Sequence, residues 1–185
     1  MTCLAPKKSA CGSPPGNRCA LRHVVAPIAG AAGGVGTIAV QLAKRAGATV
    51  LGIAGRSNDD WLVTHGVTPV NYGDGLAKRL QDAAPDGQVD AFLDFFGGGY
   101  VELAVTELGI DPQRVDTIID FPAVERFGVK GEGNADAADA TVLADLVAAG
   151  ELEVPVAEVY PLDQVQEAFR TLEQRHTRGK IVLRP

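Results

Sequence analysis

The stretch VVAPIAGAAGGVG, at residues 24–36, determines the fold of this chain. It predicts a short apolar strand, a glycine-rich turn and the start of a helix, because apolar residues then recur at helical spacing until Gly47. A strand that enters a helix through Gly30, Gly33 and Gly36 can hold a pyrophosphate. Glycine allows the backbone to approach the phosphates, and the helix start offers unpaired N–H groups and a positive dipole end.

A glycine cluster can also mark nothing more than a helix and a strand that pack closely together. Two observations favour the binding interpretation. The helical pattern begins inside the cluster, and a second apolar strand, residues 49–54, follows at the spacing of a β-α-β unit. Thr37 follows Gly36 directly, so the lysine of a nucleoside-triphosphate loop is missing and the predicted ligand is a dinucleotide.

Composition limits the class of protein. The chain has 185 residues, of which 46% are hydrophobic, enough for the core of one domain, or of one domain and a fragment. Its formal net charge of −6 argues against a nucleic acid or a membrane surface as partner. Its cysteines, Cys3, Cys11 and Cys19, match no zinc-binding spacing and favour free thiols in a cytoplasmic protein. Residues 1–22 contain no apolar run, so they predict a disordered or altered N-terminal segment rather than a signal peptide.

Beyond Gly47, strand-like and helix-like patterns alternate with short connections. Further strands are predicted at residues 67–72, 89–96, 114–120 and 127–130. Such alternation predicts an α/β fold with a doubly wound, Rossmann-like parallel sheet of about six strands and helices on both faces. Pro27 lacks the N–H group that a central strand donates, so the first strand is expected to be short or distorted.

The predicted strands differ in their expected place. Strand 89–96 is the most apolar and is expected in the middle of the sheet, whereas strand 127–130 is expected at its edge. We expect a dinucleotide-binding Rossmann domain over residues 23–155, which includes an alanine-rich helix near residues 135–149. Residues 156–185 then form a C-terminal strand-helix-strand segment.

The end of the second strand predicts which cofactor binds. In a dinucleotide fold, the residue about twenty positions past the glycine turn reads the adenosine ribose. An acidic residue there favours NAD, but this chain has Arg56 and Ser57. Because a guanidinium can donate two hydrogen bonds to a 2′-phosphate, Arg56 predicts NADP(H). The alternatives are that Arg56 is a solvated surface charge and that Ser57 caps a helix.

The sequence assigns no catalytic residue. The histidines His23, His65 and His176 are far apart and lack a spaced cysteine or carboxylate partner, so no metal site is predicted. The Tyr-x-x-x-Lys pair of another class of Rossmann oxidoreductase is also absent. Asp94 and Asp120 lie near strand ends, where cofactor-facing residues collect, yet such residues more often cap helices or turns.

The segment IAGAAGGVGTIAVQLAK, residues 28–44, resembles the nucleotide-binding domain of medium-chain dehydrogenases/reductases, and the zinc-independent, quinone-oxidoreductase-like branch is nearest. Further matching motifs are VNY at 70–72, the strand and turn at 89–98, YPLD at 160–163 and GKIVL at 179–183. The resemblance runs from residue 24 to the end of the chain, and its ordered set of motifs is more specific than the glycine turn alone.

The resemblance implies where the cofactor would lie. The glycine turn would hold the pyrophosphate, residues near Arg56 and Tyr72 would lie along the adenosine half, and the turn after strand 89–96 would approach the nicotinamide ribose. The cofactor-binding residues implied are Gly30, Ala32, Gly33, Gly34, Val35, Gly36, Arg56, Ser57, Tyr72, Phe96 and Gly97.

Residues and resemblance together predict NADP(H) binding in a reductase that transfers hydride to a quinone, an enone or a related carbonyl compound. The alternative is a non-catalytic NADP(H)-binding module or partner subunit. The edge strand at residues 127–130 and the resemblance together predict a homodimer through the edge of the Rossmann sheet. We also expect a small-molecule substrate, and the net charge argues against a nucleic-acid or membrane partner.

Two departures from the family pattern affect the expected activity. The family places a GroES-like substrate domain before the nucleotide domain, and residues 1–22 are too short to encode it. The segment 109–121 has Asp111, Pro112 and Gln113 where the family has a glycine pair. We therefore expect NADPH binding but negligible quinone or enone reduction by this chain alone, because nothing would cover the nicotinamide face or position the substrate.

Overall fold

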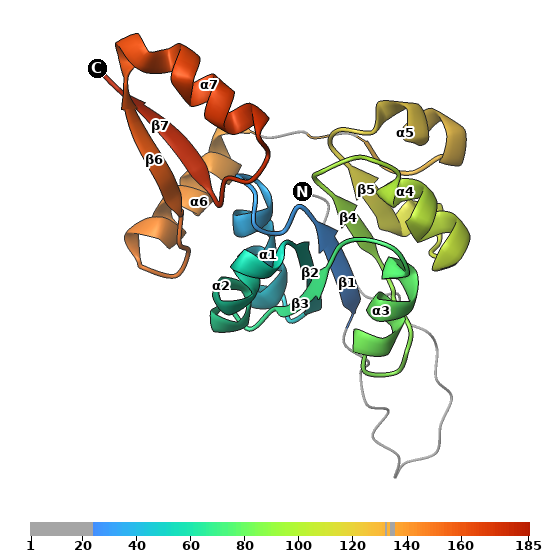
Figure 1. Cartoon of the computed structure of the whole chain (residues 1–185). Coiled ribbons are helices and arrows are strands. Elements are labelled where there is room, and N and C mark those ends of the chain that lie inside the picture. The colour runs from blue at the N-terminus through green and yellow to red at the C-terminus, as the bar shows by residue number, and fades with distance from the viewer. Residues whose placement is uncertain (1–23, 132, 134–135) are drawn as a thin grey trace.

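The computed structural model describes residues 24–131, 133 and 136–185, so the predicted N-terminal segment lies outside the described residues (Figure 1). The main body is a five-stranded parallel sheet in the order β3-β2-β1-β4-β5. Its strands are β1 (Val25–Ala29), β2 (Thr49–Ala54), β3 (Thr68–Asn71), β4 (Phe92–Asp94) and β5 (Val115–Thr117). The predicted α/β, doubly wound fold class is confirmed.

Helices cover both faces of this sheet and divide the core in two. The helices of the body are α1 (Gly36–Arg45), α2 (Asp59–Thr64), α3 (Leu76–Ala83), α4 (Tyr100–Glu102) and α5 (Phe121–Phe127). On one face, α1 and α2 contribute Val40 and Leu62 to a buried cluster that includes Ile28. On the other face, α3 and α4 cover a larger cluster that includes Phe92. The carboxyl ends of the strands are therefore the place where a ligand can reach the sheet.

Pro27 affects the centre of the sheet without breaking it. β1 is fully buried and pairs with β2 along its whole length. The carbonyl of Val25 accepts the N–H of Asp90 at 2.9 Å, and backbone groups alternate between the two sides of a strand, so Pro27 also faces β4. Its missing N–H therefore falls on the β4 side, where the pairing with β1 covers two residues.

The fourth strand is shorter than predicted. The sequence predicts a strand over residues 89–96, but β4 covers only Phe92–Asp94. Asp90 replaces part of the missing ladder, because its carboxylate Oδ2 accepts the N–H of Val25 at 2.8 Å. The predicted position of this strand inside the sheet is nevertheless correct, since β4 lies between β1 and β5.

The predicted sixth strand at residues 127–130 does not form. Phe127 ends α5, and Lys130 makes a single β-bridge to Asp116 of β5. Asp120 begins α5 by accepting the N–H of Ala123 at 3.3 Å, and Gly128 ends it with a φ of 66°. The apolar residues that suggested a strand thus belong to a helix end and a turn.

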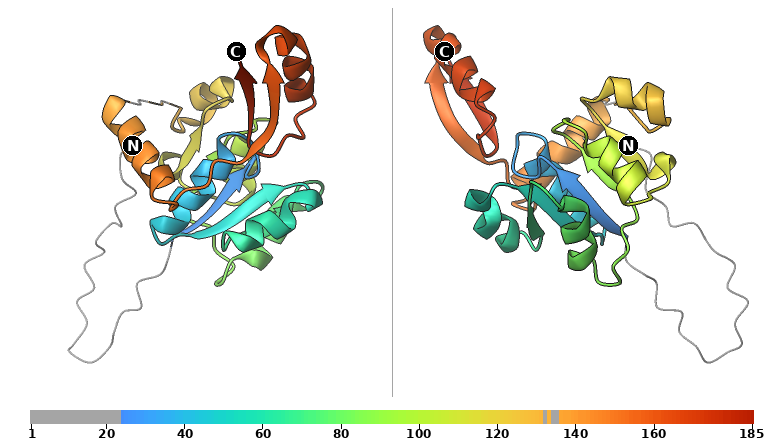
Figure 2. Two further views of the ribbon diagram at one scale, coloured as in Figure 1. Left: turned by 90° about the vertical axis from the view of Figure 1, so that its left-hand side faces the viewer. Right: turned by 45° about the vertical axis from the view of Figure 1, so that its right-hand side comes forward.

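The last part of the chain forms a second, smaller sheet. After α6 (Ala137–Ala148), β6 (Val156–Pro161) and β7 (Lys180–Arg184) pair in parallel, and α7 (Val165–Glu173) connects them. We call β6, α7 and β7 the C-terminal unit. It projects from the main body in all three ribbon views (Figures 1 and 2).

Side chains of α1 and the end of α2 hold the segment that leads into the C-terminal unit. Gln41 accepts the N–H of Glu153 at 2.8 Å and donates to the Glu153 carbonyl at 2.9 Å. Arg45 pairs with Glu151, and Nε2 of His65 lies 2.8 Å from the Glu153 carboxylate. Polar contacts therefore attach the unit to the body in addition to the chain itself.

Candidate cofactor site

The glycine turn connects β1 to α1 at the carboxyl edge of the sheet. Gly30 leaves the strand with a φ of 71°, and its carbonyl accepts the N–H of Gly33 at 2.9 Å. A Cβ atom on Gly36 would lie 2.0 Å from the same carbonyl oxygen, so only glycine fits there. α1 begins at Gly36 with no side chain capping its N–H groups and no acidic residue in its first turn. Thr37 and Ile38 already donate their N–H groups to backbone carbonyls of the turn. The N–H groups of Gly34, Val35 and Gly36 make no hydrogen bond within the described residues, so they are the donors left for an anion.

The C-terminal unit reaches back to the same turn. Gly179, with a φ of 80°, donates its N–H to the carbonyl of Ala32 at 3.0 Å. A Cβ atom on Gly34 would lie 3.3 Å from Cδ of Lys180 and 3.4 Å from its Nζ, so the lysine side chain lies along the turn. Val35, just before α1, is 44% exposed. The sequence did not predict Lys180 as a site residue, and the glycine before it, Gly179, is the one local feature that could have marked a close approach of the backbone.

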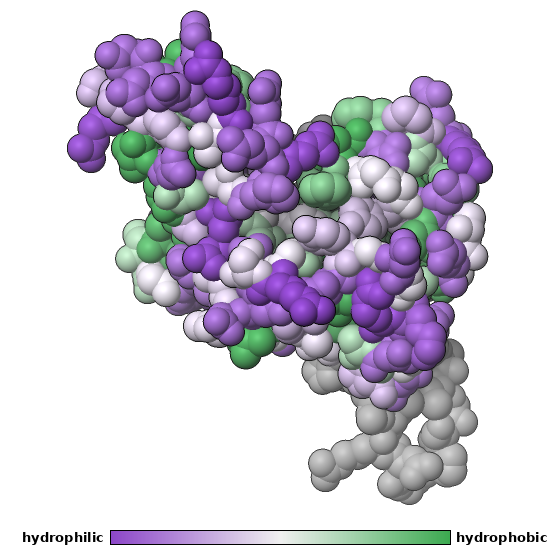
Figure 3. Space-filling model, viewed as in Figure 1, coloured by the Kyte–Doolittle hydropathy of each residue, from purple (hydrophilic) through white to green (hydrophobic). Residues whose placement is uncertain are grey.

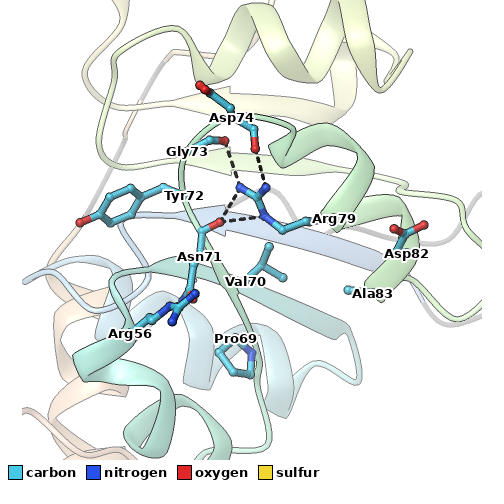
Figure 4. A pocket seen from close by; sticks show the side chains of 10 residues that line it. All are labelled: Arg56, Pro69, Val70, Asn71, Tyr72, Gly73, Asp74, Arg79, Asp82 and Ala83. Atoms are coloured by element: carbon cyan, nitrogen blue, oxygen red, sulfur yellow. Dashed lines mark hydrogen bonds between the residues drawn. The ribbon is translucent and has the colours of Figure 1, made fainter.

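A shallow pocket of about 580 Å³ lies beside the end of β3 (Figure 4). Arg56 and Tyr72 both line it, so the structure brings together two residues predicted for the adenosine half. Ser57 does not line this pocket, although it lies next to Arg56 in a short 3₁₀ turn, Arg56–Asn58. Ser57 does not cap α2 either, because the residue at the cap position is Asn58, so the capping alternative was wrong.

Arg56 is held through one nitrogen. Its Nε donates to Oδ1 of Asn71 at 3.1 Å, and its two terminal amino groups have no partner among the residues that the structure describes. Oη of Tyr72 lies nearby, 3.5 Å from where a Cβ of Gly55 would be. A guanidinium held in this way keeps its planar pair of terminal donors for a ligand.

Arg79 of α3 fixes the loop that follows β3. Its Nη2 donates to the carbonyls of Asn71 and Gly73, both at 3.0 Å, and its Nη1 donates to the carbonyl of Asp74 at 2.5 Å (Figure 4). These carbonyls belong to the residue before Tyr72 and to the two residues after it, so Arg79 fixes the backbone that carries the tyrosine. No sequence signal marks this arginine, because an arginine on a helix is more often a solvated charge.

The turn after β4 lies at the opposite end of the candidate site. Asp94 is fully buried, and its Oδ1 accepts the N–H groups of Phe96 at 3.0 Å and Gly97 at 2.8 Å. Its Oδ2 accepts the hydroxyl of Thr117 at 3.0 Å, which joins the ends of β4 and β5. Asp94 therefore shapes a turn, and Asp120 caps α5, as the non-catalytic interpretation of these two residues predicts.

Aromatic residues cover this second turn. Phe96 is 39% exposed, and the guanidinium of Arg175 lies 5.5 Å from its ring centroid. The ring of Tyr100 packs edge-on against Phe96 at 6.0 Å. Burial, followed by the negative charge of Asp94 and the nearby Tyr72, raises the pKa of the Tyr100 hydroxyl above its ordinary value of 10.0. Tyr100 is therefore a neutral, protonated group at physiological pH. Arg175, like Lys180, comes from the C-terminal part of the chain and was missed by sequence analysis.

The described residues contain no group of three or more histidine, cysteine or carboxylate side chains that could hold a metal ion. His65 instead contacts the carbonyl of Trp61 through Nδ1 at 2.8 Å and faces Glu153 through Nε2. The three cysteines and His23 lie outside the described residues.

Within the part of the chain that the structure describes, no helix combines the length and the hydropathy needed to cross a bilayer.

Comparison with known proteins identifies the relatives of this chain. Residues 66–183 match the family model described as "Zinc-binding dehydrogenase". Quinone oxidoreductase 1 of Escherichia coli (strain K12) is 29% identical over 181 residues, covering 84% of this chain and 55% of the enzyme. A "Probable zinc-binding oxidoreductase, mitochondrial" of Arthroderma benhamiae is 28% identical, covering 85% of this chain and 50% of that protein. The chain thus spans about half the length of the curated relatives it matches.

Solved structures agree with this placement at the level of the fold. The quinone oxidoreductase of Coxiella burnetii superposes with a TM-score of 0.73 at 24% identity, over 88% of this chain and 53% of that enzyme. The chain belongs to the medium-chain dehydrogenase/reductase superfamily, in its quinone-oxidoreductase-like branch.

Proposed function

We propose that this chain binds NADP(H) and forms the cofactor-binding part of a reductase that acts on quinones, enones or related carbonyl compounds. The names of its relatives support a redox role: they include quinone oxidoreductase 1, acryloyl-coenzyme A reductase and "NAD(P)H oxidoreductase RTN4IP1, mitochondrial". Because the chain covers only about half of these proteins, the complete reaction is part of the proposal.

The observation that carries the proposal is the lack of room for a side chain at Gly36. A side chain there would collide with the Gly30 carbonyl, and the tight turn leaves the N–H groups of Gly34, Val35 and Gly36 without a partner in the described residues. Such an arrangement suits a pyrophosphate. Lys180 adds a positive charge beside Gly34, so the anion would lie between a helix dipole and an ammonium group. The proposed backbone contacts are Gly30, Ala32, Gly33, Gly34, Val35 and Gly36.

Arg56 supports the choice of NADP(H) over NAD(H). Its two free terminal amino groups can donate together to a 2′-phosphate, while Tyr72 would lie along the adenosine. Ser57 stays in the proposal as a neighbouring hydroxyl that a 2′-phosphate could reach. The finding that Arg56 is oriented by a second residue weakens the alternative of a freely solvated charge.

The second turn is proposed to position the reactive end of the cofactor. When bound, a nicotinamide supplies or accepts a hydride. Asp94 orients the N–H groups of Phe96 and Gly97, and the side chain of Ile119 lies beside Gly97. Exposed Ile118, Ile119 and Phe121 add an apolar surface next to this turn, which suits a flat apolar substrate.

Calorimetric titration with NADPH and NADH tests the cofactor assignment. Charge-assisted hydrogen bonds are worth about 1.5–3 kcal/mol, so Arg56→Ala should weaken NADPH about ten- to a hundredfold and leave NADH nearly unchanged. Arg126→Ala is the matched control, because that arginine pairs with Glu102 on α4, away from the pocket. Equal losses for both cofactors in Arg56→Ala would contradict the proposed 2′-phosphate contact.

Turnover tests whether this chain alone forms a complete site for hydride transfer. The measurement is NADPH oxidation at 340 nm with a panel of quinones and α,β-unsaturated ketones. We expect negligible turnover by this chain alone. A rate of about 1 s⁻¹ or more, within the usual enzyme range, would contradict the expectation that this chain alone is incomplete, and it would also remove the alternative of a non-catalytic NADP(H)-binding module.

A homodimer is also part of the proposal. Among the described residues, only the bridge between Asp116 and Lys130 continues the sheet beyond β5, so this edge leaves backbone groups for another chain. Light scattering that detects only monomer at high micromolar concentration would contradict the dimer. The cytoplasmic location stays a prediction of the sequence.

A further inference from the structure

Asn71, the last residue of β3, makes hydrogen bonds to two side chains of opposite charge, Arg56 and Asp59. Its Oδ1 accepts from Nε of Arg56 at 3.1 Å, and its Nδ2 donates to Oδ1 of Asp59 at 3.2 Å. The same Nδ2 lies 3.5 Å from the carbonyl of Ala54 on the neighbouring strand. Asn71 is half-buried, whereas Arg56 is exposed. In the contact between these two residues, the Asn71 amide is therefore the more fixed group.

The partners determine which way the amide points. A guanidinium has only donors and a carboxylate has only acceptors, so the oxygen of Asn71 must face Arg56 and its nitrogen must face Asp59. No other side chain of this size serves both partners. Aspartate has no donor for Asp59, and leucine has neither a donor nor an acceptor.

The backbone of Asn71 is held from the opposite side. Its carbonyl accepts Nη2 of Arg79 at 3.0 Å and Nε of Arg79 at 3.3 Å, and its strand pairs with β2 at Ala54 (Figure 4). The amide therefore sits on a fixed backbone, between the exposed guanidinium of Arg56 and the carboxylate of Asp59 at the start of α2.

The arrangement keeps Arg56 and Asp59 apart. These residues are three positions from one another in one segment, so without the intervening amide they could pair directly. A carboxylate prefers the two terminal donors of a guanidinium, and a direct pair would occupy the groups that a 2′-phosphate needs. Asn71 instead accepts from Nε, so the terminal donors of Arg56, a residue that lines the pocket, keep no partner among the described residues.

We propose that Asn71 is the residue that sets the preference for a phosphorylated adenosine, by holding Arg56 away from Asp59. It is a positioning residue, since it acts through Arg56 and need not touch the cofactor. The inference rests on the proposed NADP(H) binding, and its ligand class is a nucleotide with a 2′-phosphate.

Two fragments of the cofactor test the inference. Affinities for 2′,5′-ADP and for 5′-AMP are measured by calorimetry, because their ratio isolates the 2′-phosphate. In Asn71→Leu, Arg56 can turn to Asp59, so the ratio should fall about tenfold while the affinity for 5′-AMP stays within about twofold. Adding Asp59→Asn to Asn71→Leu removes the competing carboxylate and should restore most of the ratio.

A second variant covers the case in which Asn71→Leu fails to fold. Asn71→Asp keeps the size and the bond to Arg56 but adds a negative charge, so the ratio should fall at least as far. Gln81→Glu is its control, because it adds the same charge on the exposed side of α3 and should leave the ratio unchanged. Thermal unfolding of each variant checks that it is folded.

The outcomes separate this inference from the proposed function. A wild-type chain that binds 2′,5′-ADP no better than 5′-AMP contradicts NADP(H) preference itself. A wild-type preference that survives in Asn71→Leu and Asn71→Asp overturns the role of Asn71. A preference lost in Asn71→Leu and not restored by Asp59→Asn also overturns it, because the loss would then be a general structural effect.

Discussion

The described part of the chain contains two parallel sheets built from strand-helix-strand units, and the two sheets differ in how deeply their strands are buried. Every residue of β1 is buried, and in β2 only Thr49 is partly exposed. In the C-terminal unit, no residue of β6 or β7 is buried, and α7 buries only Ala168. The same local pattern therefore gives a core in one place and an open sheet in the other.

The difference shows that a buried core requires helices packed on both faces of a sheet, and that the strand-helix-strand pattern alone does not produce one. The body has helices on both faces of its sheet, whereas α7 packs on only one side of β6 and β7 (Figures 1 and 2). Apolar residues of the C-terminal unit stay exposed, and green patches mark such residues on its otherwise polar surface (Figure 3). They are Val156, Val159, Leu162, Phe169, Leu172, Val182 and Leu183.

A pair of phenylalanine substitutions gives the largest contrast between the two regions. Phe92 is fully buried in the body, so Phe92→Ala should cost about 3–5 kcal/mol of unfolding free energy. Phe169 of α7 is 59% exposed, and Phe169→Ala should cost about 0.5 kcal/mol or less. Urea unfolding followed by circular dichroism measures both values. Similar losses would mean that the C-terminal unit has a covered core after all.

Glycine substitutions in the turn compare the body with its contact to the C-terminal unit. In Gly36→Ala, the new Cβ would lie 2.0 Å from a carbonyl oxygen, so the turn must shift, at a cost of about 1–3 kcal/mol and with loss of NADPH binding. In Gly34→Ala, the new Cβ would lie 3.3 Å from both the Gly179 carbonyl oxygen and Cδ of Lys180, so a shift of a few tenths of an ångström in the C-terminal unit would accommodate it. Thermal unfolding and NADPH titration should therefore separate the two variants. Unchanged NADPH binding in Gly36→Ala would contradict the pyrophosphate site.

Much of the body was predictable because its signals are local. Glycine spacing and apolar periodicity concern neighbouring residues, and they predicted β1, the turn, α1 and β2, together with the position of Arg56 after β2. The same local rules failed at residues 127–130, where a short apolar run fits a strand and a helix end equally well.

The contacts that orient the candidate site were not predictable in this way. Asn71 meets Arg56 only because β3 pairs with β2, and Lys180 meets Gly34 only because the C-terminal unit folds back onto the turn. Pairings between distant segments leave no periodic pattern in the sequence. The shortening of β4 has the same origin, since the effect of Pro27 falls on a neighbouring strand.

Gln41 tests how the C-terminal unit is held. Its side chain makes two hydrogen bonds to the backbone of Glu153, so Gln41→Ala should release this attachment at a cost of about 1 kcal/mol. Hydrogen exchange in β6 and β7 should then be about fivefold faster, with little change in the body. Gln113→Ala is the control, because Gln113 donates to the carbonyl of Gly128 within the body. Unchanged exchange in Gln41→Ala would mean that the other contacts suffice.

The smallest expected effect concerns a carboxylate at the edge of the body. Burial raises the pKa of Asp116 above its ordinary value of 3.8, against the lowering effects of Lys130 and the backbone N–H of Thr117. Folding therefore favours the protonated form of Asp116, and its ionised form lowers stability at pH values above the raised pKa. As the pH falls toward that pKa, this unfavourable contribution is lost.

Asp116→Asn removes the charge, so it should stabilise the protein at pH 7 by about 0.5 kcal/mol or less, which is about 1–2 °C in the unfolding midpoint. The advantage over wild type should shrink as the pH is lowered toward the raised pKa, because the wild-type carboxyl then takes up its proton in the folded state. Scanning calorimetry of both proteins at several pH values between 7 and 4.5 measures this difference. Asp163→Asn supplies the comparison from the C-terminal unit, where the carboxylate is exposed and should show no such gain. A lower midpoint for Asp116→Asn at pH 7 would mean that the attraction of Lys130 outweighs burial, even at the edge of the covered sheet.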